Sequence, residues 1–419
     1  MPISHTIMLL AGMLILALLL RPVAERRRLP FAAVLVLTGF VGSELLVWLG
    51  FDTGVRHDSF HDLVFYVFLP LLVFEAAFQI DARMLRRNLL AILMLSIPIM
   101  LLSIVITAAL VYYGIGHPLG FPWIAAFLTG AVLAATDASP VTVRFASLGV
   151  PRRLRVLMEG EDLFNDATAI VIFGIFVYVA LHPWEDIAFD DALVAFLVVF
   201  FGGLFIGLLV GLGFLLLARL FEDSIQRALV TIVSAYTAFL VANELLEVSG
   251  VMAVLVTGLI MGRVIHNDFQ DERGSFVDRL WSFNVYVAEA LVFLLMGVTV
   301  TLEMFQERWL AMLIGIAALL TARAVGIFGG TPLINRLPGS EPISPGFQRV
   351  MYMGGLRGAV VLALSLSLPV DLPYWWTIQS IAFGVVIFSL FVQAPLVEPV
   401  LRRMELVDKE TGRDGSPSG

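Results

Sequence analysis

Four carboxylates stand at the start of one long apolar stretch, LMEGEDLFNDATAIVIFGIFVYVA, at positions 157–180. They are Glu159, Glu161, Asp162 and Asp166. An ionised carboxylate at the centre of a bilayer costs about 2.5–3.5 kcal/mol even on mild scales, so an acid kept there is a candidate functional residue. On a helix, Glu161 and residue 165 share one face, and Asp162 and Asp166 share the face ~100° around it.

A fifth acid lies in an interrupted apolar stretch. Residues 121–147 contain the motif AATDASPVTV, in which Pro140 removes a backbone donor inside an apparent helix. Thr136 and Ser139 can satisfy the backbone groups that such a break exposes. The motif predicts a helix broken at its middle, with Asp137 at the break.

An arginine lies in a second stretch of this kind. Residues 346–369 contain YMGGLRGAVVLALSLSLP, in which Arg357 is surrounded by Gly354, Gly355 and Gly358. Glycines weaken a helix but permit an unwound or closely packed backbone. A buried arginine cannot lose its charge, so we expect one carboxylate to pair with it permanently. Burial disfavours the ionised form of the remaining carboxylates, which allows them to exchange a proton near neutral pH.

The composition indicates that membrane helices position these groups. The chain has 419 residues, of which 59% are hydrophobic and 14% are charged, and its mean hydropathy is +0.95. These values are typical of a polytopic membrane protein. The absence of cysteine excludes disulfides, thiolate metal sites and a cysteine nucleophile, and the six histidines lack zinc-site spacing. With no Walker or dinucleotide fingerprint either, we predict no enzyme activity, no cofactor and no nucleic-acid partner.

Thirteen apolar stretches are each close to the ~20 residues that a helix needs to cross the hydrocarbon core. They lie at 5–20, 30–49, 59–80, 88–113, 121–147, 156–181, 191–218, 226–247, 249–265, 280–301, 308–329, 346–369 and 374–400. If the N-terminus is outside, the predicted inner loops hold nearly all the arginines, and the outer loops hold only Arg56 and Arg308. This asymmetry predicts an N-out, C-in topology with a retained first helix and a short polar cytoplasmic tail at 404–419.

The two interrupted stretches are the fifth and the twelfth, seven spans apart, so they cross the membrane in opposite directions. Such a pair is the expected trace of an inverted repeat whose broken helices form an ion site at the membrane midplane. Asp166 lies about ten residues into its span, and at ~1.5 Å per residue that places it near the centre of a ~30 Å core. The fold class predicted is therefore an all-α polytopic membrane protein with two broken crossing helices.

Five motifs carry a family resemblance: EGEDLFNDATAIVIF, TDASPV, GGLRGAVVLALSLSLP and the segments 69–88 and 248–262. In their order they resemble the sodium/proton exchangers of the monovalent cation/proton antiporter superfamily, of the NhaP type. The resemblance implies one transmembrane unit over 1–403, in which helices 1–3 and 8–10 form a dimerisation part and helices 4–6 and 11–13 form an ion-binding core. It also implies a homodimer in a bacterial inner membrane, with monovalent cations, protons and the lipid bilayer as partners.

The family's site residues transfer onto this chain motif by motif. Its Asn-Asp pair falls on Asn165 and Asp166, its Thr-Asp pair on Thr136 and Asp137, and its ion pair on Glu161 and Arg357. The resemblance thus implies that Na⁺ binds at Asp166 and Asp137, with Thr136 and Asn165 as helpers.

Two features depart from the family pattern. Asp162 stands where the family usually has Ser, and the family's Thr-Asp-Pro is interrupted here as TDASP. Asp162 therefore joins the candidate cation and proton ligands, and it adds one carboxylate to the site.

The predicted function is secondary antiport of Na⁺, or Li⁺, against H⁺ by alternating access, in the service of sodium and pH homeostasis. Asn rather than Asp at position 165 resembles the electroneutral branch of the family, so the predicted exchange is one cation for one proton. Two alternatives stay open. One is K⁺/H⁺ exchange at the same site, and the other is a cation channel or proton-conducting sensor, which would need a continuous pore and a gate.

Overall fold

Residues 3–27, 29–50, 63–116, 120–142, 145, 148–182, 189–221, 223–268, 272–372, 374–404 and 406 are described by a computed structural model of the chain. Helices account for all regular secondary structure in these residues, apart from one isolated bridge between Asp137 and Leu356. The predicted all-α class is confirmed. The predicted outer-loop residue Arg56 and most of the predicted polar tail, 407–419, lie outside the described residues.

Nine helices in the described part of the chain are long and apolar enough to cross a membrane. The other predicted spans correspond to shorter apolar helices at 63–79, 123–134 and 250–265 and to the interrupted helix at 345–366. Each of the thirteen predicted segments therefore contains helix, but their number as membrane spans and their orientation stay predictions.

By internal packing the chain divides into two compact units. The first unit comprises Met1–Ala82, Ala167–Glu307 and Ala363–Trp375, and the second comprises Arg83–Asp166, Arg308–Leu362 and Trp376–Gly419. Five helices cross the unit boundaries: α5 (Ala82–Met94), α9 (Arg152–Leu181), α14 (Leu302–Ala324), α17 (Ala359–Leu366) and α18 (Trp375–Phe388).

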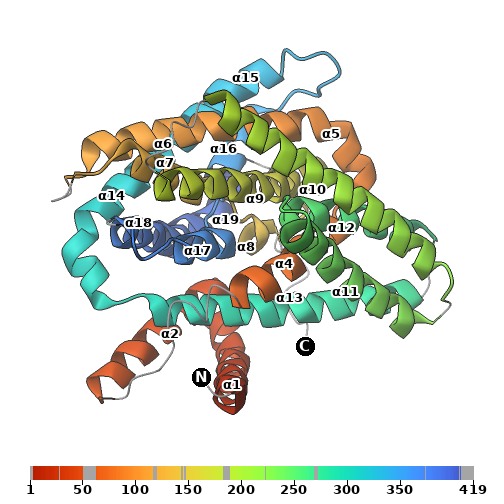
Figure 1. The fold of residues 1–419 in the computed structure, drawn as a ribbon, viewed down its shortest axis with the longest axis horizontal. Helices are drawn as coiled ribbons and strands as arrows, with labels where there is room; N and C mark the ends of the chain where they lie inside the picture. The colour runs from red at the N-terminus through yellow and green to blue at the C-terminus, as the bar shows by residue number, and fades with distance from the viewer. Residues whose placement is uncertain are drawn as a thin grey trace, which may run out of the picture. The chain divides into compact units, whose positions relative to one another are not determined.

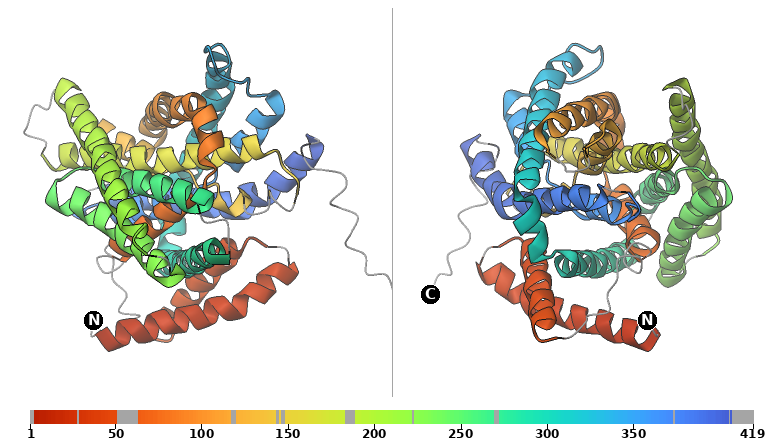
Figure 2. Two further views of the ribbon diagram at one scale, coloured as in Figure 1. Left: turned by 90° about the vertical axis from the view of Figure 1, so that its right-hand side faces the viewer. Right: turned by 60° about the vertical axis from the view of Figure 1, so that its left-hand side comes forward.

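The first unit is built around close helix pairs. Its other elements are α1 (Ile3–Arg27), α2 (Phe31–Trp48), η1 (Leu63–Phe68), α4 (Leu69–Gln79), α10 (Phe189–Ala218), α11 (Ser224–Leu240), η3 (Val241–Leu245), α12 (Gly250–Asp268) and α13 (Glu272–Thr299), with η denoting a π-helical turn. Helices α2 and α13 lie side by side, as do α10 and α12 (Figures 1 and 2). At the crossing of α2 and α13, a Cβ on Gly39 or Gly297 would collide with the facing backbone. Small residues thus let these helices approach closely, as is common between membrane helices.

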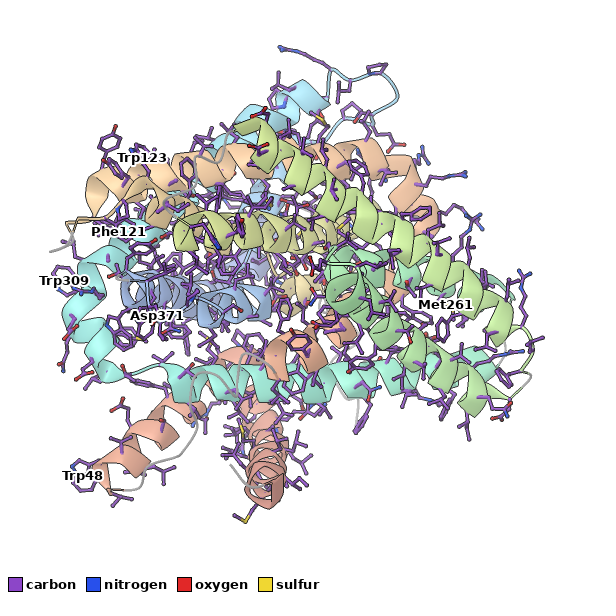
Figure 3. All side chains as sticks on the ribbon, viewed as in Figure 1. Trp48, Phe121, Trp123, Met261, Trp309 and Asp371 are labelled. Atoms are coloured by element: carbon purple, nitrogen blue, oxygen red, sulfur yellow. The ribbon has the colours of Figure 1, made fainter. Side chains whose placement is uncertain are left out.

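Large apolar side chains point away from the protein on several helices. Trp48 at the end of α2 is 81% exposed, and Trp123 and Trp309 project from α7 (Trp123–Ala134) and α14 (Figure 3). Trp123 also stacks on Tyr112, with ring centroids 4.0 Å apart. Exposed tryptophan near helix ends is typical of the interface between lipid tails and water.

The second unit holds the remaining elements. They are η2 (Leu95–Ile99), α6 (Met100–Gly114), α7 (Trp123–Ala134), α8 (Ser139–Thr142), η4 (Val325–Gly329), α15 (Gly330–Ile334), α16 (Pro345–Gly354), η5 (Ser389–Gln393) and α19 (Ala394–Arg403). Pro98 lies inside η2, where its missing N–H favours the wider turn. Ile99 of η2 packs against Gly326 and Gly330, so the two helices containing η2 and η4 meet at these turns.

The loop that leads into α16 is held by charged side chains. Glu341 pairs with Arg87 of α5 and with Arg153 of α9, whose Nε is 3.2 Å from Glu341 Oε2. Arg153 Nε also donates to Asn88 Oδ1 (2.9 Å). These contacts fix the start of α16 against the helix that carries the four acids.

Candidate functional site

The helix predicted to break at its middle is two helices. α7 ends at Ala134, residues 135–138 are not helical, and α8 begins at Ser139. Pro140 lies in the first turn of α8, where its missing N–H needs no partner. Asp137 Oδ1 accepts from the Ser139 amide (3.1 Å), which caps this turn. The break at Thr136 and Asp137 is therefore confirmed, and it follows from local sequence.

The glycine-rich stretch is broken in the same way. α16 ends at Gly354, and α17 begins at Ala359. The two unwound segments meet, because the Asp137 amide donates to the Leu356 carbonyl (3.0 Å) and the two residues form an antiparallel bridge. The backbone groups that the two breaks expose thus satisfy one another, as burial requires.

The Asp137 carboxylate lies against the backbone of the second break. A Cβ on Gly358 would collide with this carboxylate, so Asp137 packs directly against the residue that precedes α17. Asp137 is therefore held at the start of α17 as well as at the start of α8. Both ends present N–H groups that attract an anion.

The third component is α9, which is continuous through all four acids. Glu161 and Asn165 are both 2% exposed, whereas Asp162 and Asp166 keep part of their surface accessible. Asn165 Nδ2 donates to Thr136 Oγ1 (3.3 Å), which joins α9 to the first break. The structure therefore brings together Thr136, Asp137 and the α9 residues, and the predicted division of α9 into two faces is present.

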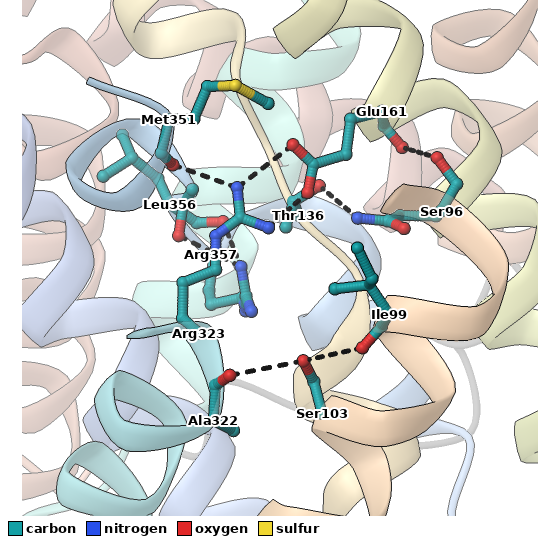
Figure 4. Close-up of polar contacts among 12 residues, drawn as sticks. Ser96, Ile99, Ser103, Thr136, Glu161, Ala322, Arg323, Met351, Leu356 and Arg357 are labelled. Carbon is teal, nitrogen blue, oxygen red and sulfur yellow. Dashed lines mark hydrogen bonds and ion pairs between the residues drawn. The ribbon is translucent and has the colours of Figure 1, made fainter. Parts of the chain in front are cut away.

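The predicted ion pair between Glu161 and Arg357 is wrong: Glu161 pairs with Arg323 of α14 (Figure 4). The contact is bidentate, with Arg323 Nη1 bound to Oε1 and Nη2 3.1 Å from Oε2. Arg323 Nη2 also donates to the Met351 carbonyl in the last turn of α16 (3.0 Å). Arg323 thus neutralises the buried carboxylate of Glu161 and also caps the carboxyl end of α16.

Arg357 has a different task, which explains why it is not the partner. Its Nε donates to the Leu133 carbonyl in the last turn of α7 (2.6 Å), and its Nη1 donates to the carbonyls of Gly355 and Leu356 (3.0 and 3.1 Å). The carboxyl end of a broken helix carries carbonyls without helical partners and a partial negative charge. Because Arg357 lies in the break between α16 and α17, its guanidinium donates its hydrogen bonds to these carbonyls.

Arg323 is the functional residue that the sequence analysis missed. It stands in the apolar stretch 308–329, and a charged residue inside such a stretch was the signal available. Gly355 makes room for it, since a Cβ there would lie 2.7 Å from Arg323 Nε. Of the three glycines predicted at the break, Gly355 therefore admits a guanidinium and Gly358 admits a carboxylate.

The buried oxygens of α9 define what this site can bind. Within the described residues, Asp162 Oδ1, Asn165 Oδ1 and Asp166 Oδ1 are inaccessible and accept no hydrogen bond. A buried acceptor oxygen without a hydrogen-bond donor destabilises the folded protein unless a proton or a cation binds to it. Asp162 and Asp166 can thus bind either a proton or a cation, whereas the charge of Glu161 is already neutralised by Arg323.

Replacing Gly358 with Ala should disturb the site more than replacing Gly354 with Ala. A Cβ at Gly358 meets the carboxylate and Cβ of Asp137, whereas a Cβ at Gly354 meets only the flexible end of Met158. We expect Gly358→Ala to cost about 1–3 kcal/mol of stability, as overpacking does, and to reduce Na⁺-dependent proton flux. Thermal unfolding and vesicle flux assays of both variants check this, and equal behaviour of the two would contradict the close contact at Gly358.

Comparison with protein families gives one match that covers almost the entire chain. The family model described as sodium/hydrogen exchanger, transmembrane, matches residues 13–403. All residues of the site described above lie inside the matched range.

Individual relatives and solved structures agree with this match. The chain is 34% identical over 389 residues to the Na⁺/H⁺ antiporter ApNhaP of Aphanothece halophytica, covering 92% of this chain and 72% of the relative. It is 32% identical over 416 residues to the low-affinity Na⁺/H⁺ antiporter NhaS1 of Synechocystis, covering 98% and 76%. Its fold matches the sodium proton antiporter MjNhaP1 of Methanocaldococcus jannaschii with a TM-score of 0.80 at 19% identity, covering 96% of this chain and 100% of that one.

Proposed function

The chain belongs to the transmembrane sodium/hydrogen exchanger family and is a multi-pass Na⁺/H⁺ antiporter, and we propose that it exchanges one Na⁺ for one H⁺ at Asp166. Asp137, Thr136, Asn165 and Asp162 complete the proposed site. The observation that carries the proposal is the set of buried carboxylate oxygens on α9 that accept no hydrogen bond from any described residue. A carboxylate of this kind takes either a proton or a dehydrated cation, and this competition couples the two fluxes.

The electroneutral stoichiometry is part of the proposal. Of the ionisable groups at the site, Glu161 is occupied by Arg323, and position 165 is an amide that donates to Thr136. We propose that Asp166 is the group that cycles between a proton and Na⁺ and that Asp162 keeps the same charge throughout, so each turn moves one charge in each direction. Asp137 stays bound to the Ser139 amide at the start of α8.

The membrane arrangement belongs to the same proposal. We propose thirteen spans, an outer N-terminus and an inner C-terminus, with inverted repeats that cross at the two breaks. Spans 4–6 and 11–13, which contain Thr136, Asp137, Glu161, Asp162 and Asp166, act as the ion-binding core. Spans 1–3 and 8–10 provide the dimerisation part of a homodimer.

Proton flux in reconstituted vesicles tests the function. A pH-sensitive dye inside the vesicles reports proton movement when Na⁺, Li⁺ or K⁺ is added to the outside at a clamped membrane potential. We expect Na⁺ to drive opposing proton flux at a rate that does not depend on the potential. A flux driven by K⁺ alone would favour the K⁺/H⁺ alternative, and cation movement without opposing proton movement would indicate a channel and overturn the proposal.

Replacing Asp162 with Ser tests the residue that departs from the family pattern. If Asp162 contributes its oxygen to the cation, the variant should bind Na⁺ more weakly by about tenfold, the effect of ~1.4 kcal/mol, because one charged ligand becomes a neutral one. Transport should remain insensitive to the membrane potential, since Asp166 is retained. The apparent Na⁺ affinity measured across a potential series checks both statements.

Glu159→Gln is the matched control, because Glu159 lies on the same helix but pairs with Arg155 near its start. An Asp162→Ser variant with the control's Na⁺ affinity would place Asp162 outside the cation site. A variant that became voltage-dependent would show that Asp162 carries charge through the cycle and that the one-for-one stoichiometry is wrong.

A further inference from the structure

The guanidinium of Arg357 has donors that no described residue accepts. Its Nε and Nη1 donate to the carbonyls of Leu133, Gly355 and Leu356, and these are its hydrogen bonds to the described residues, which leaves Nη2 for another partner. The Nε of Arg323, which lines a cavity together with Arg357, is buried and donates to no described residue. Arg357 is only 3% exposed. Because arginine stays charged when buried and unsatisfied donors are costly, Nη2 requires a partner that the protein itself does not supply.

A small cavity lies beside this guanidinium. It has a volume of about 20 Å³, and its polar lining consists of side chains of the second unit: Ser103, Thr107, Glu161, Asn165, Arg323 and Arg357. One water molecule needs roughly 10–15 Å³ of such space and two to four polar partners. The cavity therefore has the size and the lining for one ordered water.

The hydroxyl groups of α6 provide acceptors for that water. Ser103 donates its hydrogen to the Ile99 carbonyl (3.0 Å), and its oxygen lies between the carbonyls of Ile99 and Ala322 (Figure 4). Its lone pairs are thus available to a water, as is the hydroxyl of Thr107, which is 2% exposed. A cation is disfavoured here by the charges of Arg323 and Arg357, and an anion is disfavoured by Glu161.

We propose that this cavity binds one ordered water, which accepts from Arg357 Nη2 and donates to the hydroxyls of Ser103 and Thr107. The water completes the hydrogen bonding of the guanidinium that holds the carboxyl end of α7. Since Thr136 and Asp137 follow that end directly, Ser103 and Thr107 act as positioning residues for the cation site. The water site stands on the geometry alone, and its effect on Na⁺ binding rests on the proposed function.

The test compares the wild type with the double variant Ser103→Ala, Thr107→Val, which removes both acceptors with little change of volume. In wild-type protein at a resolution that shows waters, we expect density within hydrogen-bond distance of Arg357 Nη2, and we expect it to vanish in the double variant. We also expect the double variant to bind Na⁺ about tenfold more weakly. Thr129→Val is the control, since Thr129 is buried on α7 and donates to its own helix at Ala125 (2.8 Å) without lining the cavity.

Three outcomes would overturn the inference. A dry cavity in the wild type removes the water site. Density that persists unchanged in the double variant shows that the hydroxyls do not hold the water. A Na⁺ affinity equal to that of Thr129→Val removes the positioning role. If the wild type itself exchanged no Na⁺ for H⁺, the proposed function would fail, while the density would still decide whether the water site exists.

Discussion

Replacing Asp166 with Asn is expected to abolish Na⁺/H⁺ exchange while leaving a folded protein. The amide keeps the shape of the side chain but cannot release a proton in return for a cation. Since Asp166 Oδ1 is buried without a hydrogen-bond donor among the described residues, the neutral side chain should be tolerated at least as well as the acid. Proton flux in vesicles should fall to the level of protein-free vesicles, and the thermal unfolding temperature should not decrease.

Stabilisation by Na⁺ gives a second measurement on the same variant. A cation that binds only the folded state stabilises it by about 2.7 kcal/mol at a concentration of 100 Kd, so Na⁺ should raise the unfolding temperature of the wild type and not that of Asp166→Asn. Asp191→Asn is the matched control, because it makes the same chemical change at an exposed position in the first turn of α10. Exchange at the wild-type rate in Asp166→Asn would show that the carrier is another residue.

The parts of the site that could be predicted from sequence are those that local chemistry decides. Pro140 interrupts a helix that comes from the residues before it, and the glycines around Arg357 weaken one, so both breaks were visible in the sequence. The periodicity of α9 likewise separates Glu161 from Asp162, because their directions differ by ~100° on any helix. The structure confirms the two breaks and the burial of Glu161.

The partner of Glu161 could not be predicted in this way. Arg323 is 162 positions away in the chain, and Arg357 competes for the same role. Which arginine pairs with the Glu161 carboxylate depends on the backbone carbonyls that each helix break leaves without a donor. Those carbonyls are known only once the positions of the half-helices are known. The cavity beside Ser103 has the same origin, since its volume is what remains between side chains of several helices.

Replacing Arg323 with Ala should destabilise the protein more than replacing Arg357 with Ala. Loss of Arg323 leaves Glu161, which is 2% exposed, as an unpaired buried charge, and breaking a buried pair from one side costs about 3–5 kcal/mol. Loss of Arg357 leaves backbone carbonyls without a donor, for which the cost is about 1–3 kcal/mol per group and is reduced if water enters the space. Thermal unfolding of the purified variants should therefore rank Arg323→Ala below Arg357→Ala.

The double variant Glu161→Gln, Arg323→Gln distinguishes the effect of the two charges from the effect of the space that the side chains fill. With both charges removed, no buried carboxylate is left alone, so we expect the unfolding temperature to recover part of the loss seen in Arg323→Ala. Arg402→Ala is the control, since Arg402 pairs with Glu398 at an exposed position and such pairs contribute little. Two results together would contradict this pairing: a lower stability of Arg357→Ala than of Arg323→Ala, and a rescue by Glu161→Gln of Arg357→Ala but not of Arg323→Ala. Glu161 would then be paired with Arg357 in the membrane. The capping roles of Arg323 on α16 and of Arg357 on α7 would have to be exchanged.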